Sequence, residues 1–250
     1  MRVLLCSALM LVNFGCGQAE VDLSVVEIDR GKISGTMDEG VRVFRGIPYA
    51  APPTGDRRWK PPQPVERWEG VRECTDWGFS CVHVPYPPGS MWTGPEWGDP
   101  AEQSEDCLHL NVWTPADYTP GANLPVMFYI HGGANILGSA SQGFLPGQPL
   151  YTGRSLAERE GVVVVTADYR LGPLGFLALP ELSAESESGG SGNYAALDHI
   201  AALEWVRDNI VRFGGDPERV MIFGQSAGAI NVCTLLASPR AEGLFASALM

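Results

Sequence analysis

Residues 224–228 read Gly-Gln-Ser-Ala-Gly, a pattern that can carry a nucleophilic serine. Four apolar, β-prone residues precede it, and the segment 229–236 that follows is typical of a helix. A strand, a tight turn and a helix form the context of a nucleophile elbow, in which Gly224 and Gly228 leave room for the turn. We therefore predict that Ser226 is a nucleophile at a helix N-terminus, where the helix dipole favours negative charge. A Gly-Ser turn without a function is the alternative.

A second cluster, His-Gly-Gly-Ala at residues 131–134, directly follows the apolar segment 124–130. Backbone N–H groups of a glycine-rich loop can point at one oxygen, because no side chain shields them. With the N–H of Ala227 they would form an oxyanion hole, as such loops do in esterases. A plain turn is the alternative, but the nearby elbow motif favours the catalytic interpretation.

Several segments have the patterns of strands and helices that could position these residues. We expect strands at 109–113, 124–130, 161–166 and 220–223, and helices at 154–160, 193–213 and 229–236. The β-branched run at 161–166 is typical of a strand covered on both faces. Before them, residues 25–30, 32–36 and 41–45 predict a small antiparallel meander, and the polar segment 183–191 predicts an exposed loop. The alternation indicates an α/β fold with a mostly parallel central sheet.

The chain has 250 residues and a formal net charge of −12. This length suits one large domain or two small ones. The acidic balance argues against nucleic acid as a partner, because nucleic-acid binding needs a basic surface.

The N-terminus has the pattern of an export signal. Arg2 precedes an apolar run of about ten residues, which is too short to span a bilayer. Gly17 and Ala19 suit cleavage after residue 19, so we predict a signal peptide at 1–19 and a secreted or cell-envelope protein. A lipid anchor on Cys16 and an uncleaved segment are the alternatives.

Export implies an oxidising compartment, in which cysteines can pair. Outside the signal region the cysteines are Cys74, Cys81, Cys107 and Cys233. They allow three complete pairings, among which the residues alone do not choose. No pair has the Cys-x-x-Cys spacing of a zinc site, and no metal is expected.

Longer motifs now give a resemblance to a known family. They occur at residues 44–50, 104–111, 169–172, 175–177, 192–194, 205–210 and 213–217, and the last runs into the serine motif. In this order and spacing the chain resembles the type-B carboxylesterases, a group that includes the cholinesterases. The resemblance implies the α/β-hydrolase fold from about residue 25 onward.

The resemblance also implies roles for single residues. Ser226 would be the nucleophile, and Gly133, Ala134 and Ala227 would supply the oxyanion N–H groups. No cofactor is implied, and the partner is a small-molecule ester. Further implied features are a Cys81–Cys107 disulfide, free buried thiols at Cys74 and Cys233, and two buried ion pairs, Arg58–Glu105 and Arg170–Asp198.

Three residues depart from the family pattern. Ala134 replaces the third glycine of the loop but keeps its N–H, so the oxyanion hole should survive. Asn135 stands where an aromatic residue is common. Gln225 replaces a glutamate that helps to hold choline, which argues against a cholinesterase although Trp92 lies near the position of the choline-stacking tryptophan.

The order of the catalytic triad of serine, acid and histidine along the chain gives one further expectation. In α/β-hydrolases the acid and the histidine follow the serine, whereas all four histidines here precede Ser226. We interpret residues 20–250 as the N-terminal part of a carboxylesterase domain, with a sheet that is incomplete at the C-terminus. The function predicted for the parent protein is ester hydrolysis through an acyl-enzyme on Ser226. The alternatives are a non-catalytic, cholinesterase-like binding module and an inactive, truncated chain.

Overall fold

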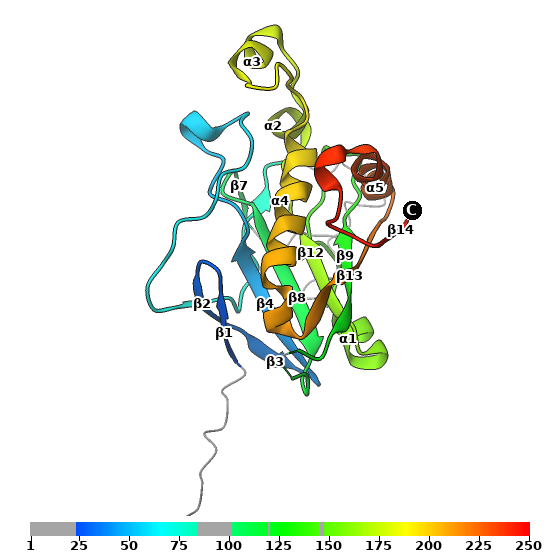
Figure 1. Cartoon of the computed structure of the whole chain (residues 1–250). Helices are drawn as coiled ribbons and strands as arrows, with labels where there is room; N and C mark the ends of the chain where they lie inside the picture. The colour runs from blue at the N-terminus through cyan, green and yellow to red at the C-terminus, as the bar shows by residue number, and fades with distance from the viewer. Residues whose placement is uncertain (1–23, 85–101, 120, 146–147) are drawn as a thin grey trace, which may run out of the picture.

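A seven-stranded sheet forms the centre of the molecule in a computed structural model, which describes residues 24–250 except 85–101, 120 and 146–147 (Figure 1). In sheet order the strands are β14 (Ser247–Leu249), β13 (Gly215–Gly224), β9 (Leu124–Ile130), β12 (Val163–Ala167), β8 (His109–Pro115), β4 (Val41–Pro48) and β3 (Thr36–Asp38). From β14 to β12 all neighbours are parallel. The β12–β8, β8–β4 and β4–β3 pairs are antiparallel. The predicted α/β sheet, parallel after its N-terminal strands, is confirmed.

The N-terminal meander is divided between two sheets. Strands β1 (Val25–Ile28) and β2 (Gly31–Ser34) form a separate three-stranded sheet with β5 (Val71–Glu73), whereas β3 and β4 form a hairpin in the main sheet. The division falls at Gly35, where a β-carbon would lie 2.6 Å from the ring of Phe44. Only glycine allows the backbone to pass so close to this buried ring. Two further pairs of short strands are β6 (Ser80–Cys81) with β7 (Gln103–Ser104), and β10 (Gly143–Leu145) with β11 (Gln148–Pro149).

The helices largely follow the predicted segments. They are α1 (Arg154–Glu160), α2 (Gly172–Phe176), α3 (Pro180–Glu185), α4 (Tyr194–Asn209) and α5 (Ala227–Ala237), with 3₁₀ turns η1 (Gly55–Arg57), η2 (Ile210–Phe213) and η3 (Pro239–Ala241). The helix expected at 193–213 is α4 continued by η2, and it ends where Gly214 adopts φ 82°, as a glycine C-cap predicts. The loop expected at 183–191 is helical up to Glu185, since Pro180 opens α3.

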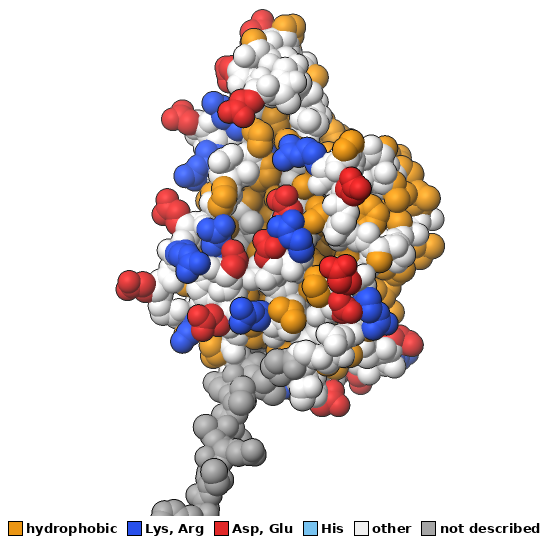
Figure 2. Space-filling model, viewed as in Figure 1, with side chains coloured by type: hydrophobic (Ala, Val, Ile, Leu, Met, Phe, Trp, Pro, Cys, Tyr) orange, Lys and Arg blue, Asp and Glu red, His pale blue; other side chains and the backbone are white. Residues whose placement is uncertain are grey.

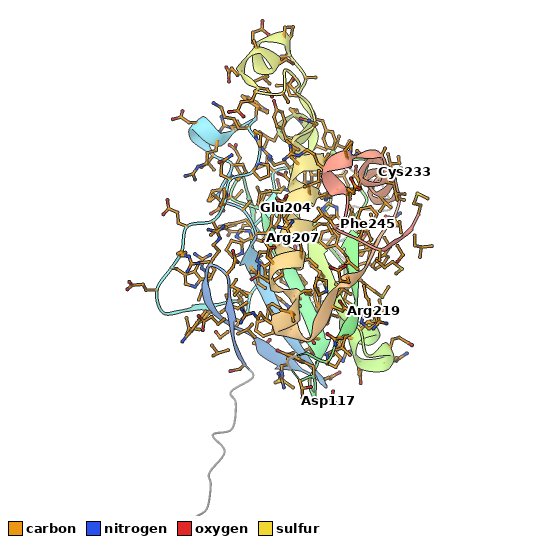
Figure 3. The ribbon with its side chains drawn as sticks, in the orientation of Figure 1. Asp117, Glu204, Arg207, Arg219, Cys233 and Phe245 are labelled. Carbon is orange, nitrogen blue, oxygen red and sulfur yellow. A yellow bond between two sulfur atoms is a disulfide. The ribbon has the colours of Figure 1, made fainter. Side chains whose placement is uncertain are left out.

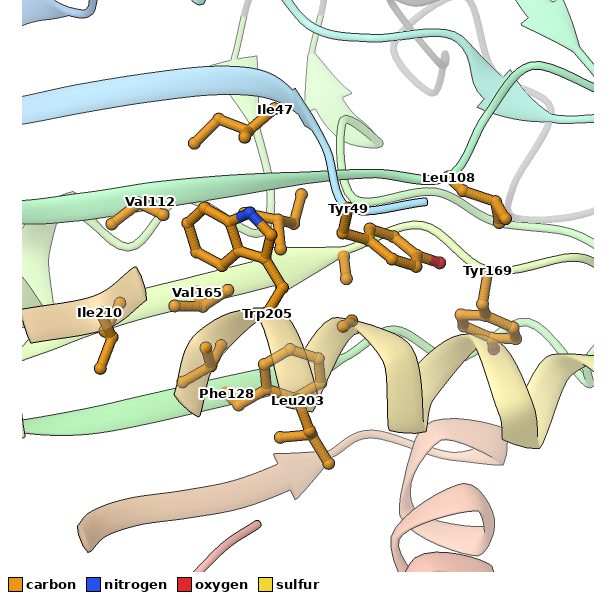
Figure 4. Packing of buried hydrophobic residues seen from close by; sticks show 14 of the residues in the cluster. Ile47, Tyr49, Leu108, Val112, Phe128, Val165, Tyr169, Leu203, Trp205 and Ile210 are labelled. Carbon is orange, nitrogen blue, oxygen red and sulfur yellow. The ribbon is translucent and has the colours of Figure 1, made fainter. Parts of the chain in front are cut away.

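Helices cover both faces of the sheet. Alternate residues of a strand point to opposite faces, so Val163 and Val165 pack in one buried cluster with Leu203 of α4, while Val164 packs in another with Ala157 of α1. Figure 4 shows α4 lying along the first face, with Leu203, Trp205 and Ile210 near Phe128 and Val165. The prediction that the strand at 161–166 is covered on both faces is confirmed.

Two ion pairs occur as the resemblance implies, but only one is buried. The guanidinium of Arg170 donates to both carboxylate oxygens of Asp198 on α4, at 2.7 and 2.9 Å, and both side chains are almost fully buried. Arg58 binds Glu105 at 2.5 and 2.6 Å, yet its side chain is 40% exposed. The expectation that this second pair is buried was wrong, because Arg58 follows η1, which has no buried residue.

The structure has one disulfide among the four cysteines outside the signal region and forms none of the three complete pairings. Cys81 and Cys107 form a disulfide, as the resemblance implies, and Cys74 is a buried free thiol. Cys233 is free but exposed, which corrects the expectation that it is buried. It lies on the outer side of α5 (Figure 3), where Ile230 and Leu236 are also exposed. Figure 2 shows hydrophobic side chains gathered over this part of the molecule.

The signal peptide, Cys16 and Trp92 lie outside the described residues. In the remainder, no helix has the length and apolar character that a bilayer span requires.

Candidate active site

The predicted nucleophile lies at the junction of β13 and α5. Ser226 adopts φ 57° and ψ −122°, directly before the first residue of α5. A positive φ is uncommon for a residue with a side chain and marks local strain. The turn leaves no room at its flanks, because a β-carbon on Gly224 would lie 2.6 Å from the carbonyl oxygen of Gly228. The sequence thus forms the sharp strand–turn–helix that was predicted, with the Ser226 side chain exposed at its tip.

The glycine-rich loop lies beside this turn because the two strands that end there are neighbours. Ile130, the last residue of β9, is paired with Gly224, the last of β13, and its carbonyl oxygen accepts a hydrogen bond from the N–H of Gln225 at 3.4 Å. Gly132 then passes directly over the elbow: a β-carbon there would lie 3.0 Å from the β-carbon of Ser226. The site therefore lies outside the carboxyl ends of parallel strands, where ligands bind in open α/β sheets.

The backbone of both segments offers N–H groups for an oxyanion. Within the loop, the N–H groups of Ile136 and Leu137 donate to the carbonyl oxygen of Gly133. These two hydrogen bonds turn the loop without using the N–H of Gly133 or Ala134. Ala227 is the first residue of α5, and helix geometry gives its N–H no partner inside the helix. The structure thus brings Gly133, Ala134 and Ala227 near Ser226, and their role as oxyanion donors stays a prediction.

A pocket of about 250 Å³ opens at this place. Its lining consists of Gly132, Gly133, Ala134, Leu137, Gln142, Tyr151, Gln225 and Ser226. None of these side chains is ionised at neutral pH: burial raises the pKa of Tyr151, so its phenol stays protonated. The described lining is therefore uncharged, with polar groups among mainly apolar surface.

None of the four histidines is among the described residues that line this pocket. His131 is buried, and its Nδ1 donates to the carbonyl oxygen of Gly132 at 2.8 Å. Its ring stacks on the ring of Tyr169, which in turn contacts the ring of His199. Burial, with a smaller effect from His131, lowers the pKa of His199 to about 3, so this histidine is neutral.

The remaining two histidines lie in other parts of the molecule. His109 is on β8, where burial lowers its pKa, and it lines a different pocket with Asp76 and Asp106. His83 is hydrogen-bonded with Gln103. In the described part of the chain, no group of three or more His, Cys, Asp or Glu side chains has a geometry that could hold a metal ion.

Sequence reasoning missed a pair of asparagines beside the glycine-rich loop of residues 131–134, which is called the oxyanion loop below. Asn231 on α5 donates from Nδ2 to Oδ1 of Asn135 at 2.9 Å, and Asn135 donates back from Nδ2 at 3.4 Å. The sequence shows that Asn135 departs from the family pattern, but its partner Asn231 is 96 residues away. No local pattern joins the two.

Comparison with known proteins gives consistent results. The model of the carboxylesterase family matches residues 22–250. The chain is 47% identical to a para-nitrobenzyl esterase of Bacillus subtilis (strain 168) over 226 residues, which are 90% of this chain and 43% of that protein. It is 45% identical to a fumonisin B1 esterase of Sphingopyxis macrogoltabida, covering 88% of this chain and 38% of that protein.

Two solved structures similar to this chain are also esterases. A structure of a para-nitrobenzyl esterase matches with a TM-score of 0.78 at 44% identity, covering 91% of this chain and 44% of that one. A Geobacillus stearothermophilus carboxylesterase matches with a TM-score of 0.76 at 43% identity, covering 90% and 43%. The chain thus spans less than half the length of these relatives. The fold, the elbow and these similarities together show that the chain belongs to the carboxylesterase family, with an α/β-hydrolase fold.

Proposed function

We propose that the full-length protein containing this chain is a serine esterase that hydrolyses carboxylic esters through an acyl-enzyme on Ser226. The observation that supports this most is the placement of Ser226. It adopts a strained conformation at the start of α5 and shares a pocket with the loop of Gly133 and Ala134. A serine at such an elbow, next to backbone N–H donors, is the arrangement that acyl transfer uses.

The chemistry proceeds in two steps. The Ser226 hydroxyl attacks the ester carbonyl as a general base removes its proton, and the oxyanion accepts hydrogen bonds from the N–H groups of Gly133, Ala134 and Ala227. The tetrahedral intermediate collapses and expels the alcohol, which takes a proton from the same base. In the second step the base takes a proton from a water molecule that attacks the acyl-enzyme, and it returns this proton to the Ser226 oxygen as the acid leaves. Since no histidine is among the described lining of the Ser226 pocket, we assign the base to a histidine that follows Ser226 in the full-length protein.

The substrate that fits the described lining is a neutral ester. Gln142, Tyr151 and Gln225 are the polar side chains of the pocket besides Ser226. None of them carries the negative charge that would attract a quaternary ammonium group, so choline esters are not the proposed substrates. The partner is accordingly a small, uncharged ester, and no cofactor takes part in the steps above.

A fluorophosphonate probe and a p-nitrophenyl ester test this function in the full-length protein. The probe should label Ser226, and Ser226→Ala should abolish both labelling and hydrolysis. Ser188→Ala, which changes an exposed serine of a surface turn, is the matched control and should behave like the wild type. Ester hydrolysis that survives in Ser226→Ala would exclude this nucleophile. A wild type that is not labelled would favour the non-catalytic binding module.

We also propose that the protein is exported, with cleavage after Ala19 or, as the alternative, a lipid on Cys16. Support comes from the apolar run near the N-terminus and from the Cys81–Cys107 disulfide, since disulfides persist in oxidising compartments. The mass of the mature N-terminal peptide distinguishes the two forms. A mature protein that still begins at Met1 would contradict export by cleavage.

A further inference from the structure

The two halves of the predicted oxyanion hole are joined by a pair of side-chain amides. Asn135 directly follows Ala134, the last donor of the loop. Asn231 is four residues, about one helical turn, after Ala227, the donor of α5. The amides exchange hydrogen bonds in both directions, at 2.9 and 3.4 Å. We propose that Asn135 and Asn231 are positioning residues that fix the distance between the loop donors and the helix donor; this inference rests on the proposed function.

The amide pair is part of a larger hydrogen-bonded network. Tyr169 donates from its hydroxyl to the carbonyl oxygen of His131 at 2.9 Å and lies 3.2 Å from Oδ1 of Asn135. Tyr169 is fully buried and Asn231 is 7% exposed. Buried polar groups are stronger partners than exposed ones, and leaving one unpaired is costly. The network therefore resists separation of the loop from α5.

Two close backbone contacts between the loop and the elbow act in the opposite sense. Gly132 passes so close to Gln225 that a β-carbon would lie 2.6 Å from its carbonyl oxygen. Gly228 packs just as tightly against the backbone of His131. Such steric contacts set only the shortest distance between the two segments. Attraction must set the longest distance: the hydrogen bond from Gln225 to Ile130 holds the start of the loop, and the Asn135–Asn231 amides hold the part beyond Ala134.

The backbone at Asn135 makes Asn231 the cleaner position for a test. Asn135 has φ 61°, which asparagine and glycine tolerate better than other residues. Its carbonyl oxygen also accepts a hydrogen bond from the N–H of Gly172 at 2.7 Å. Asn231 lies within α5 and acts only through its side chain, so leucine or alanine there removes the amide and raises the helix propensity.

Kinetics of the full-length protein with a neutral p-nitrophenyl ester test the proposal. We expect Asn231→Leu and Asn135→Gly to lower kcat by about ten- to a hundredfold, less than the ~10²–10³ of losing an oxyanion donor outright. KM should change less than threefold, because the oxyanion forms only in the transition state. The Ki of a trifluoromethyl ketone, which binds as a tetrahedral adduct, should rise by the factor by which kcat/KM falls. Asn123→Gly changes an exposed asparagine with φ 53° and is the matched control.

The double variant separates a joint action from two independent ones. If the amides act as a pair, Asn135→Gly with Asn231→Leu should be no slower than the slower single variant. Effects that multiply would overturn the proposal, as would a kcat within twofold of the wild type in both single variants. Asn231→Ala serves the same test if the leucine variant does not fold. Activity that survives Ser226→Ala would instead refute the proposed function, so the two failures are distinct.

Discussion

Replacing Gly228 by alanine tests how tightly the elbow packs against the oxyanion loop. Gly228 is the second residue of α5, and a β-carbon there would lie 2.8 Å from the carbonyl oxygen of His131 and closer still to that of Ile130. Both oxygens belong to backbone that is held at the end of β9. The added methyl group can fit only if α5 moves away from this strand, and Ser226 and Ala227 would move with it.

The expected magnitude follows from two opposing effects. In a helix, alanine is more stable than glycine by up to about 1 kcal/mol, but overpacking at a close backbone contact costs about 1–3 kcal/mol. We expect a net loss of roughly 1 kcal/mol, which lowers Tm by about 2–4 °C for a domain of this size. Relief of the clash needs a shift of about 1 Å, and a misplacement of this size can lower the rate ~10²-fold. KM should change little, because the displaced groups act in the transition state.

The assay combines thermal melting with p-nitrophenyl ester kinetics of the full-length protein. Gly190→Ala is the matched control: it lies in a surface turn, and the nearest atom to its β-carbon would be the hydroxyl of Ser188 at 3.8 Å. This control should keep the Tm and kcat of the wild type. A Gly228→Ala variant that melts higher than the wild type and keeps its kcat would refute the reasoning. It would show that helix propensity outweighs the contact with β9.

Two further predictions concern pH and substrate charge. The folded-state pKa of His199, about 3, lies below its unfolded value of 6.5, so the free energy of unfolding that depends on neutral His199 is fully present above pH 6.5 and falls as the pH drops towards 3. In urea unfolding, His199→Gln should remove up to about 2 kcal/mol of the stability lost between pH 7 and pH 5. The same dependence of unfolding free energy on pH in both proteins would contradict this. Gln225→Glu should raise kcat/KM for butyrylthiocholine, relative to its neutral 3,3-dimethylbutyl isostere, about fivefold, the effect of ~1 kcal/mol from a partly screened charge. An unchanged ratio would show that the alcohol group binds away from residue 225.

The parts of the site that depend on local sequence were predictable. The elbow follows from an apolar strand, two glycines and a helical segment, and the structure has Ser226 at that turn. The bounds of α1 and β9 also agree with the predicted segments, because a glycine or a polar turn follows each of them. In these segments the backbone conformation is determined by residues a few positions apart, so the sequence pattern is enough to predict it.

The features that depend on distant contacts were not predictable in the same way. Strand β5 has three exposed residues and exists only because it pairs with β2. The family resemblance implied a buried Cys233, and the helix pattern could not correct this, because an apolar helix does not show which of its faces meets the sheet. Asn135 and Asn231 are 96 positions apart, and they become neighbours only because β9 pairs with β13; the Nδ2 of Asn231 then lies 2.9 Å from Oδ1 of Asn135.

The pairing of β9 with β13 also has a consequence for folding. The oxyanion loop and the nucleophile follow the last residues of these strands, Ile130 and Gly224, which are direct neighbours in the sheet. A slip of two residues in this register would keep the same faces buried, yet it would carry Ser226 some 6–7 Å along the strand from the loop. A compact chain with misaligned strands would therefore be chemically inert. Reactivity at Ser226 would then report on the correct alignment of the sheet as well as on catalysis.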